Sequence, residues 1–243
     1  MPTYSICPLA LCEFSLDASL YTYRMNFGEI YNTACYIWYI EGSQPKTMVD
    51  AGVSASMFAA KGDSVTELMS VEDGLATLGL KPDDIEIIIL THLHFDHIAL
   101  GYLYPNAKFV VQKNELDYAL HPHAIDAGLY EKATFEDLDM EVIDGKKEII
   151  PGVCVFPTPG HTPGGQSVEV NTLAGRAIIT GFCCTLRSFT KSDEMERWGW
   201  EVAVPLIHHD VRDAYDSILE VKRRADIVIT LHDTTLVGKE RIP

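Results

Sequence analysis

Residues 85–90 read Ile-Glu-Ile-Ile-Ile-Leu, an apolar run of strand length that is typical of a strand buried on both faces. Such strands lie in sheets whose two faces are both covered, so the run favours an α/β fold with a sheet in its interior. Directly after the run the chain turns polar and reads THLHFDH from Thr91. Because a loop that follows a strand emerges at the edge of its sheet, these polar side chains are expected to converge there.

Other apolar segments of strand length accompany this run. They are residues 34–41, 46–49, 108–112, 153–156, 167–170, 177–180 and 227–230. One helix is predicted to start after Ser70, and a second over residues 210–224, where apolar residues recur at helical spacing. Strands early and late in the chain, with helices between and after them, indicate sheets covered by helices on their outer faces, that is, an α/β sandwich.

Residues 11–31 and 186–209 resist assignment, because they carry many aromatic side chains with little periodicity. Long irregular stretches in a compact domain are often binding loops or lids. Surface packing explains them equally well, so both interpretations stay open.

The composition excludes several classes of protein. The chain has 243 residues, 47% of them hydrophobic, which suits a single domain spanning residues 1–243 with a sizeable core. A formal net charge of −16 argues against nucleic-acid binding, which needs clustered Lys and Arg. No segment is long and apolar enough to cross a bilayer, and we recognise no signal peptide. We therefore expect a cytoplasmic protein whose six scattered cysteines are reduced.

The motif from His92 to His97 places four metal-capable side chains within six residues. His92 and His94 can point the same way in an extended segment, whereas Asp96 and His97 diverge and can face a second ion. Imidazole and carboxylate together suit zinc, iron, manganese or cobalt rather than calcium or magnesium. A single histidine here would more often cap a helix or bond to the backbone, but this cluster predicts a metal site.

Two further histidines follow predicted strands. His161 lies in PTPGHTPGG, whose prolines and glycines fix the backbone, and a ligand must hold its position to about 0.5 Å. His232 follows the strand at residues 227–230. Either alone would be an ordinary loop histidine, but beside the first motif both become candidate ligands. The predicted metal-binding residues are His92, His94, Asp96, His97, His161 and His232.

The order HxHxDH, then GHT in a Pro/Gly loop, then a histidine after the last strand, resembles the metallo-β-lactamase superfamily. Asp50 in Val-Asp-Ala-Gly also matches the acid of that family's DxG motif. The resemblance covers residues 34–233, and THLHFDHIALG and PTPGHTPGGQS are most similar to the lactonases that open N-acyl homoserine lactones. It implies a four-layer αββα sandwich with the site at one edge of the paired sheets.

The resemblance also implies that the six candidate ligands divide into two triads. These are His92, His94 and His161 for one metal, and Asp96, His97 and His232 for the other. Asp50 would hold a ligand imidazole by its other nitrogen. We expect one or two divalent transition-metal ions, with zinc as the first choice and iron or manganese as alternatives.

The sequence departs from the family pattern at the residue that follows Thr180-Gly181. Relatives with two metals usually carry a bridging Asp there, but this chain has Phe182, and Thr185 and Leu186 occupy the region of the lactonases' tyrosine. Three interpretations stay open. Two ions are bridged by hydroxide alone, or Cys183 supplies a thiolate as a nearby cysteine does in some β-lactamases of the superfamily, or the second site is lost and three histidines hold one ion.

The predicted chemistry is that of a metal-dependent hydrolase. A metal-bound hydroxide would open a lactone or cleave an ester of a moderately apolar small molecule. Aromatic side chains from Tyr21 to Tyr31 and from Phe189 to Trp200 would form the pocket that holds it. Asp96 is the candidate catalytic residue, because it can orient the nucleophile or carry its proton to the leaving alkoxide. Candidate oxyanion donors, chosen by composition alone, are Tyr118, His121, His123, His208 and His209.

Other functions stay open as alternatives. One is another hydrolase of the same fold, acting on thioesters, phosphotriesters or β-lactams. A second is a di-iron redox protein, although no residues are left over for a flavin module. A third is a degenerate, non-catalytic protein that binds a metal or ligand, which Phe182 suggests. As partners we expect a small-molecule substrate, no nucleic acid and no membrane, with a homodimer as an option.

Overall fold

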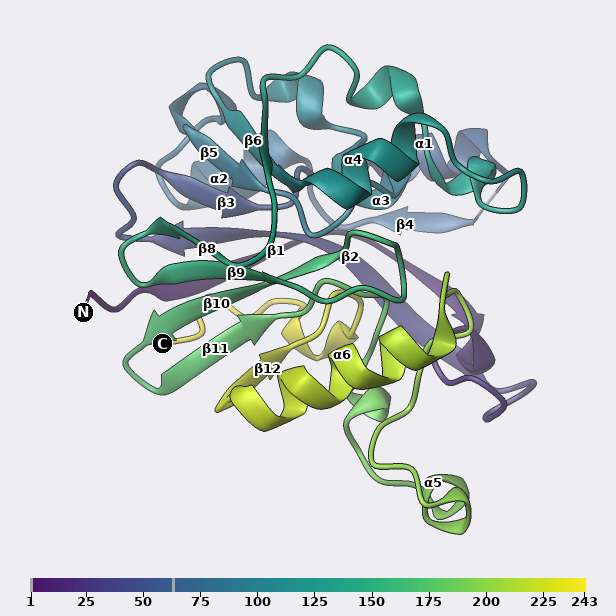
Figure 1. Cartoon of the computed structure of the whole chain (residues 1–243). Coiled ribbons are helices and arrows are strands. Elements are labelled where there is room, and N and C mark those ends of the chain that lie inside the picture. The colour runs from purple at the N-terminus through teal and green to yellow at the C-terminus, as the bar shows by residue number, and fades with distance from the viewer. Residues whose placement is uncertain (1, 63) are drawn as a thin grey trace.

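The computed structural model describes residues 2–62 and 64–243, which form two β-sheets stacked face to face with helices outside them (Figure 1). The seven-stranded sheet runs in the order β4 (Val65–Glu67), β1 (Ser5–Asp17), β2 (Ile30–Glu41), β3 (Thr47–Val49), β5 (Ile87–Ile89), β6 (Lys108–Gln112) and β7 (Met140–Ile143). The five-stranded sheet runs in the order β12 (Ile227–Ile229), β11 (Gly175–Ile179), β10 (Gln166–Thr172), β9 (Val153–Pro157) and β8 (Lys147–Ile150).

Helices lie on the outer face of each sheet (Figure 1). Those beside the seven-stranded sheet are α1 (Ala55–Ala60), α2 (Val71–Thr77), α3 (Phe95–Ile98) and α4 (Lys113–Leu120). The long α6 (Val211–Arg224) covers the five-stranded sheet, whereas the short α5 (Asp193–Trp198) projects from the body on a loop (Figure 1). Among the described residues, no helix is long and apolar enough to span a membrane.

Alternating side chains on the strands create three apolar layers. In β2, Ile37 and Tyr39 pack under the helices α2 and α4, whereas Tyr36 and Trp38 pack between the two sheets. In β11, Ile178 packs toward α6. Because each sheet is apolar on both faces, each needs a cover on both, and the result is the four-layer αββα sandwich that the resemblance implied.

The predicted helices are confirmed and begin at capping residues. The Ser70 hydroxyl accepts a hydrogen bond from the Asp73 backbone N–H at 3.1 Å, and the Asp210 carboxylate accepts from two N–H groups at the start of α6. Each such cap satisfies a helix N–H that has no partner within the helix, and contributes about 1 kcal/mol. Three basic residues in the last turn of α6 complement the negative end of the helix dipole.

The structure confirms the predicted strands, and it also shows strands within residues 11–31. The second half of β1 and the start of β2 occupy much of that segment, which the sequence left unassigned. Seven consecutive residues of β1 are buried, so the strand has no alternating pattern, and it contains Pro8 and a register shift between Ala10 and Cys12. Residues 186–209 are mostly irregular, apart from α5 and one short 3-10 turn.

Candidate metal centre

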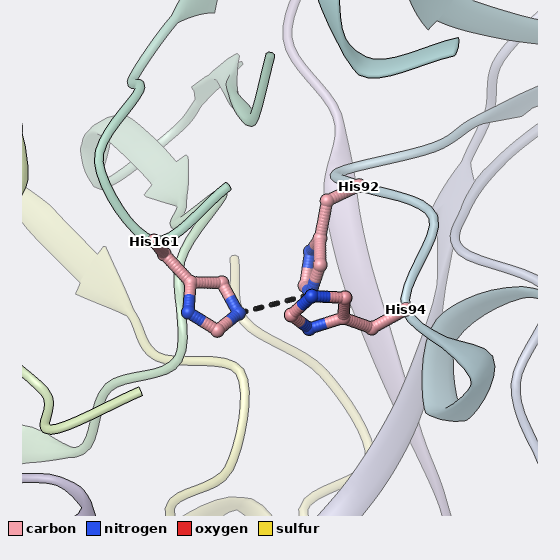
Figure 2. Close-up of side chains that lie close together, drawn as sticks. All are labelled: His92, His94 and His161. Atoms are coloured by element: carbon pink, nitrogen blue, oxygen red, sulfur yellow. Dashed lines mark hydrogen bonds between the residues drawn. The ribbon is translucent and has the colours of Figure 1, made fainter. Parts of the chain in front are cut away.

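The six predicted ligands meet at one edge of the sandwich, because the loops that follow β5, β9 and β12 all emerge there. His92 and His94 come from the loop after β5, Asp96 and His97 from α3, His161 from the loop after β9, and His232 from the loop after β12. Figure 2 shows His92 and His94 on one loop facing His161 on another. The structure therefore brings all six side chains together.

The first cluster consists of His92, His94 and His161, whose nearest ring nitrogens all lie within 4.8 Å of one another. The Nε2 atoms of His92 and His161 are 3.2 Å apart (Figure 2). Two nitrogens bound to one tetrahedral zinc ion at 2.0–2.1 Å would be separated by about 3.3 Å. The spacing of these two rings therefore fits joint coordination of a divalent ion.

Hydrogen bonds to the other ring nitrogens fix the tautomers that such coordination needs. His161 Nδ1–H donates to the carbonyl oxygen of Ile207 at 2.7 Å. Thr91 Oγ1 gives its only proton to Asp50, so it accepts from His92 Nδ1–H at 3.1 Å. Both histidines are thereby left with a lone pair on Nε2, which faces the centre of the cluster.

Burial keeps these rings neutral. It lowers the pKa of His92 and His94 well below the usual value, and lowers that of His161 to about 4. The neighbouring imidazoles act in the same direction, because charging one ring repels a charge on the next. Neutral imidazole is the form that binds a metal ion.

The second cluster surrounds the carboxylate of Asp96. Its Oδ2 atom lies 3.3 Å from His97 Nε2 and 3.7 Å from His232 Nε2. The Cys35 thiol joins the group, since its sulfur, the Asp96 carboxylate and a nitrogen of His232 all lie within 4.8 Å of one another. The rings of His97 and His92 are 4.1 Å apart between centroids, so the two clusters adjoin.

The charges of the second cluster differ from those of the first. Burial alone would lower the pKa of His97, but the carboxylates of Asp96 and Asp50 outweigh it and raise that pKa to about 10. Burial alone would raise the pKa of Asp96, but His97 and His232 hold it far below its usual range. Burial lowers the pKa of His232 to about 4. A proton on His97 therefore offsets part of the negative charge of the two carboxylates, and a divalent cation could offset it instead.

Asp50 links the two clusters. Its Oδ1 accepts from the backbone N–H of Thr91 at 2.7 Å, and its Oδ2 accepts from Thr91 Oγ1 at 2.9 Å and from His97 Nδ1–H at 2.7 Å. The residue is fully buried and has a φ of 58°, in the left-handed region where Asp is tolerated. The expected contact between Asp50 and a candidate ligand imidazole is therefore present at Nδ1 of His97.

The donors present fit one or two divalent transition-metal ions. His97 Nε2 is buried and has no hydrogen-bond partner among the described residues, although a polar atom of this kind normally has one. The first cluster offers three imidazole nitrogens, whereas the second offers the carboxylate of Asp96, the imidazole of His232 and the thiol of Cys35, with the His97 imidazole 3.3 Å from that carboxylate. These are ligands that zinc and its neighbours in the first transition row prefer.

A buried carboxylate fixes the two ligand loops relative to each other. Glu115 of α4 is fully buried and accepts from the N–H of Leu93 at 2.9 Å and from the N–H of Gly164 at 3.1 Å. A Cβ atom at Gly164 would lie 2.0 Å from the backbone nitrogen of Glu115, so only glycine allows this approach. The sequence indicated the rigid loop but gave no sign of Glu115.

The structure also settles where Phe182 lies. Its ring is 1% exposed and packs with Phe156, Val202 and Ile218 beneath α6, away from the ligand cavity. Phe182 is not in the described lining of that cavity. Its neighbour Cys183 lines the cavity instead. Cys35 was missed, because nothing distinguishes it within the apolar strand β2.

A cavity of about 440 Å³ opens above the two clusters. Its walls are largely apolar, and the rings of Phe14, Phe58 and Phe95 follow one another at centroid distances of 5.0 Å. Of the predicted segment from Tyr21 to Tyr31 only Tyr21 is in the described lining, and Phe14 and Leu20 line the cavity from the residues before it. The segment from Phe189 to Trp200 does not line this cavity, so that part of the predicted pocket is wrong.

The five candidate oxyanion donors also lie outside the described lining of this cavity. The Tyr118 hydroxyl donates to Asp126, and its ring contacts His209. His208 Nδ1–H donates to the carbonyl oxygen of Pro205 at 2.7 Å. Composition alone therefore did not identify side chains that reach the cavity. Tyr21 does reach it, from a segment that the sequence left unassigned.

The fold and the two ligand clusters define an αββα sandwich that carries metal-type side chains at the edge of its paired sheets. The chain belongs to the metallo-β-lactamase superfamily, whose family model matches residues 30–232. An N-acyl homoserine lactonase of Bacillus thuringiensis is 27% identical over 234 residues, which cover 90% of this chain and 88% of the relative. A second N-acyl homoserine lactonase, from Rhizobium radiobacter, is 27% identical over 68% of this chain and 61% of its own.

One solved structure is similar to this chain over its full length. It is an N-acyl homoserine lactone hydrolase with the product N-hexanoyl-L-homoserine bound at its catalytic metal centre. The match has a TM-score of 0.77 and 26% sequence identity, and covers 100% of both chains. The superfamily and fold expected from the motifs are thus confirmed, as is the relationship to the N-acyl homoserine lactonases.

Proposed function

We propose that this protein is a metal-dependent hydrolase that opens a lactone, or cleaves an ester, of a moderately apolar small molecule. One ion would be held by His92, His94 and His161, and a second by the cluster around Asp96, with zinc as the first choice. When bound, such an ion lowers the pKa of a water molecule to about 7 and polarises a carbonyl oxygen.

The observation that carries the proposal is the geometry of the first cluster beneath an apolar cavity. Three neutral imidazoles converge from two loops, and two of their Nε2 atoms are 3.2 Å apart at the base of a cavity of about 440 Å³. A three-histidine site with an open position is sufficient to activate water near neutral pH. A purely structural site would have a fourth protein ligand and no cavity.

The chain's own residues supply the proton transfer. The Asp96 carboxylate lines the cavity beside both clusters. An oxygen of this carboxylate that is not bound to an ion can orient the nucleophilic water and pass its proton to the leaving alkoxide. We therefore assign proton transfer to Asp96.

The walls favour a neutral substrate with an apolar chain. Phe14, Phe58 and Phe95 form an aromatic surface beside the ligand clusters. The cation of Lys61 also lines the cavity, but it lies over the Phe95 ring at 4.4 Å and pairs with Glu131. An acyl homoserine lactone, which the similar enzymes hydrolyse, has a neutral ring and an apolar chain that suit these walls.

The test combines metal content with a substrate panel. Protein purified without added metal is analysed by elemental mass spectrometry, and hydrolysis is measured for N-acyl homoserine lactones of several chain lengths, an aryl ester, a thioester, a phosphotriester and a cephalosporin. We expect bound transition metal, with the highest kcat/KM on a lactone or ester. Turnover fastest on another member of the panel would replace the substrate class.

A control separates catalysis from mere metal binding. A chelator should abolish turnover, and readdition of zinc should restore it. Protein that takes up no zinc, iron or manganese, or that binds metal but turns over no substrate, would instead support the degenerate, non-catalytic alternative.

A further inference from the structure

We propose that Cys35 is a thiolate ligand of the second cation site, together with Asp96, His97 and His232, and that this site selects a thiophilic divalent ion such as zinc, cobalt or cadmium. The inference rests on the metal-dependent function proposed above. It assigns to a residue of strand β2 the negative charge that a bridging aspartate supplies in relatives with two metals.

The distances place the Cys35 sulfur among cation ligands. The sulfur, the Asp96 carboxylate and a ring nitrogen of His232 all lie within 4.8 Å of one another. Ligand atoms that share one zinc ion at 2.0–2.3 Å are separated by at most about 4 Å, so a small shift of side chains closes the group. His97 Nε2, which is buried and makes no hydrogen bond within residues 2–62 and 64–243, lies 3.3 Å from the same carboxylate.

Main-chain pairing holds Cys35 in this position. The backbone N–H of Ala34 donates to the carbonyl oxygen of His232 at 3.1 Å, and Thr33 Oγ1 donates to the same oxygen at 2.9 Å. In return, His232 Nδ1–H donates to the carbonyl oxygen of Ala34 at 3.2 Å. These three bonds fix the residue next to Cys35 against the histidine of the cluster and leave His232 Nε2 free for an ion.

The surroundings of Cys35 are not those of an ordinary core cysteine. On one side it packs with apolar side chains, including Val53 and Phe95, and it pairs across the strands with Cys12. On the other side it meets an ionised carboxylate and an imidazole lone pair. The Asp96 carboxylate faces the Cys35 sulfur and a His232 nitrogen, so a divalent cation bound between them satisfies all three groups.

Cys183 is the competing thiol, because it lines the cavity beside the same cluster. It belongs to neither group of mutually close ligand atoms among the described residues, whereas Cys35 does. The loop that carries Cys183 also places Phe182 in the core beneath α6. The distances therefore favour Cys35 as the ligand and leave Cys183 as part of the cavity wall.

Binding forms a metal–sulfur bond and releases two protons to solvent, one from the Cys35 thiol and one from His97 Nε2, so that one dication is balanced by the two anionic ligands Asp96 and Cys35. Thiolate is a soft ligand that favours zinc or cobalt over manganese. Manganese should therefore fill the site less readily than cobalt does.

The test is a cobalt titration of metal-free protein kept under a non-thiol reductant, followed by absorption spectroscopy. A thiolate bound to cobalt gives a charge-transfer band in the near ultraviolet, which nitrogen and oxygen ligands do not give. We expect the unchanged protein to bind two equivalents, one of which brings the band. We expect Cys35→Ser to bind one equivalent and to lack the band.

Three matched variants separate the interpretations. Cys183→Ser and Cys184→Ala, a buried neighbour outside the cavity lining, should keep both equivalents and the band. Cys12→Ser, which alters the packing next to Cys35, should keep them too. Retention of one equivalent by Cys35→Ser shows that the variant is folded.

Several outcomes would overturn the inference. A band that survives in Cys35→Ser and disappears in Cys183→Ser would move the ligand to Cys183. Loss of the band in Cys12→Ser as well would reduce Cys35 to a packing role, and a second equivalent without any band would exclude a thiolate. One equivalent with full hydrolysis would refute this inference alone, whereas no bound cobalt at all would refute the proposed function too.

Discussion

The two ligand clusters lie side by side but are built in opposite ways. The first contains three buried histidines that are all kept neutral, and backbone or hydroxyl oxygens orient two of them. The second contains an ionised aspartate, a histidine whose pKa is raised to about 10, and a thiol from a distant strand. The first is thus an uncharged cage of nitrogens, and the second is a charged group that needs a counterion.

This difference indicates how the site tolerates Phe182. A cage of neutral imidazoles needs no bridging carboxylate to hold an ion, so the first cluster is complete without it. An ion in the second cluster would lack the negative charge of a bridging aspartate, and under the proposal above the Cys35 thiolate would supply it. Asp50 contacts His97 directly and reaches His92 through Thr91, so one buried carboxylate orients rings in both clusters.

The largest effect is expected from His161→Ala, which removes one of the three nitrogens of the first cluster. Loss of an ion worth several kcal/mol of transition-state stabilisation lowers kcat/KM about a thousand-fold. Kinetics and elemental mass spectrometry on the same preparation check this. The matched control is His123→Ala, an exposed histidine outside the cavity lining, which should change neither. Activity of His161→Ala within tenfold of the unchanged protein would contradict the role of the first cluster.

A second large effect is expected from Phe182→Asp, which restores the acid of the family pattern. The ring packs under α6, so the substitution leaves a cavity and buries a charge without a partner. We expect the free energy of unfolding to fall by about 3–5 kcal/mol, with no gain in bound metal. Urea denaturation and metal analysis measure both, with Phe182→Leu as the milder control. Tighter binding of a second ion would show that position 182 can reach the cluster after all.

An intermediate effect is expected from Asp50→Asn, which tests whether the clusters share one support. The amide would present N–H to the Nδ1–H of His97 and turn that ring away from its metal-binding tautomer. We expect kcat/KM and affinity for the second ion to fall by about 10–100-fold, with a smaller loss at the first. Asp117→Asn, on the exposed face of α4, serves as the control. Equal losses of affinity for the first and the second ion would mean that Asp50 orients His92 through Thr91 as strongly as it orients His97 by direct contact.

The same contrast explains how far the sequence could be interpreted. Some histidines are recognisable in the sequence because they lie in one short motif or directly follow an apolar strand. At His92, His161 and His232 a residue type that binds metals coincides with the end of a strand. Cys35 carries no such signal, since it lies within an apolar strand and meets Asp96 and His232 only through tertiary pairing. The Ile207 carbonyl that orients His161 is backbone, so no residue type encodes it. Strand β1 was missed because burial on both faces removes the alternation on which strand prediction depends.

The smallest effect is expected from Tyr21→Phe, which compares the aromatic neighbours of the two clusters. The Tyr21 ring lies 6.0 Å from that of His232, and Tyr130 lies 4.8 Å from that of His94. The Tyr21 hydroxyl donates to Thr33 Oγ1 at 2.7 Å, which in turn donates to the His232 carbonyl oxygen, so its proton is already engaged in holding the second cluster. Removal of one such bond costs about 1 kcal/mol, and kcat/KM should fall less than tenfold.

Tyr130→Phe, whose hydroxyl contacts Glu115, is the matched variant for the first cluster and should behave alike. A fall of a hundred-fold or more in kcat at constant KM, confined to Tyr21→Phe, would instead make Tyr21 the donor to the substrate oxyanion, in place of the tyrosine that this chain lacks near Thr185.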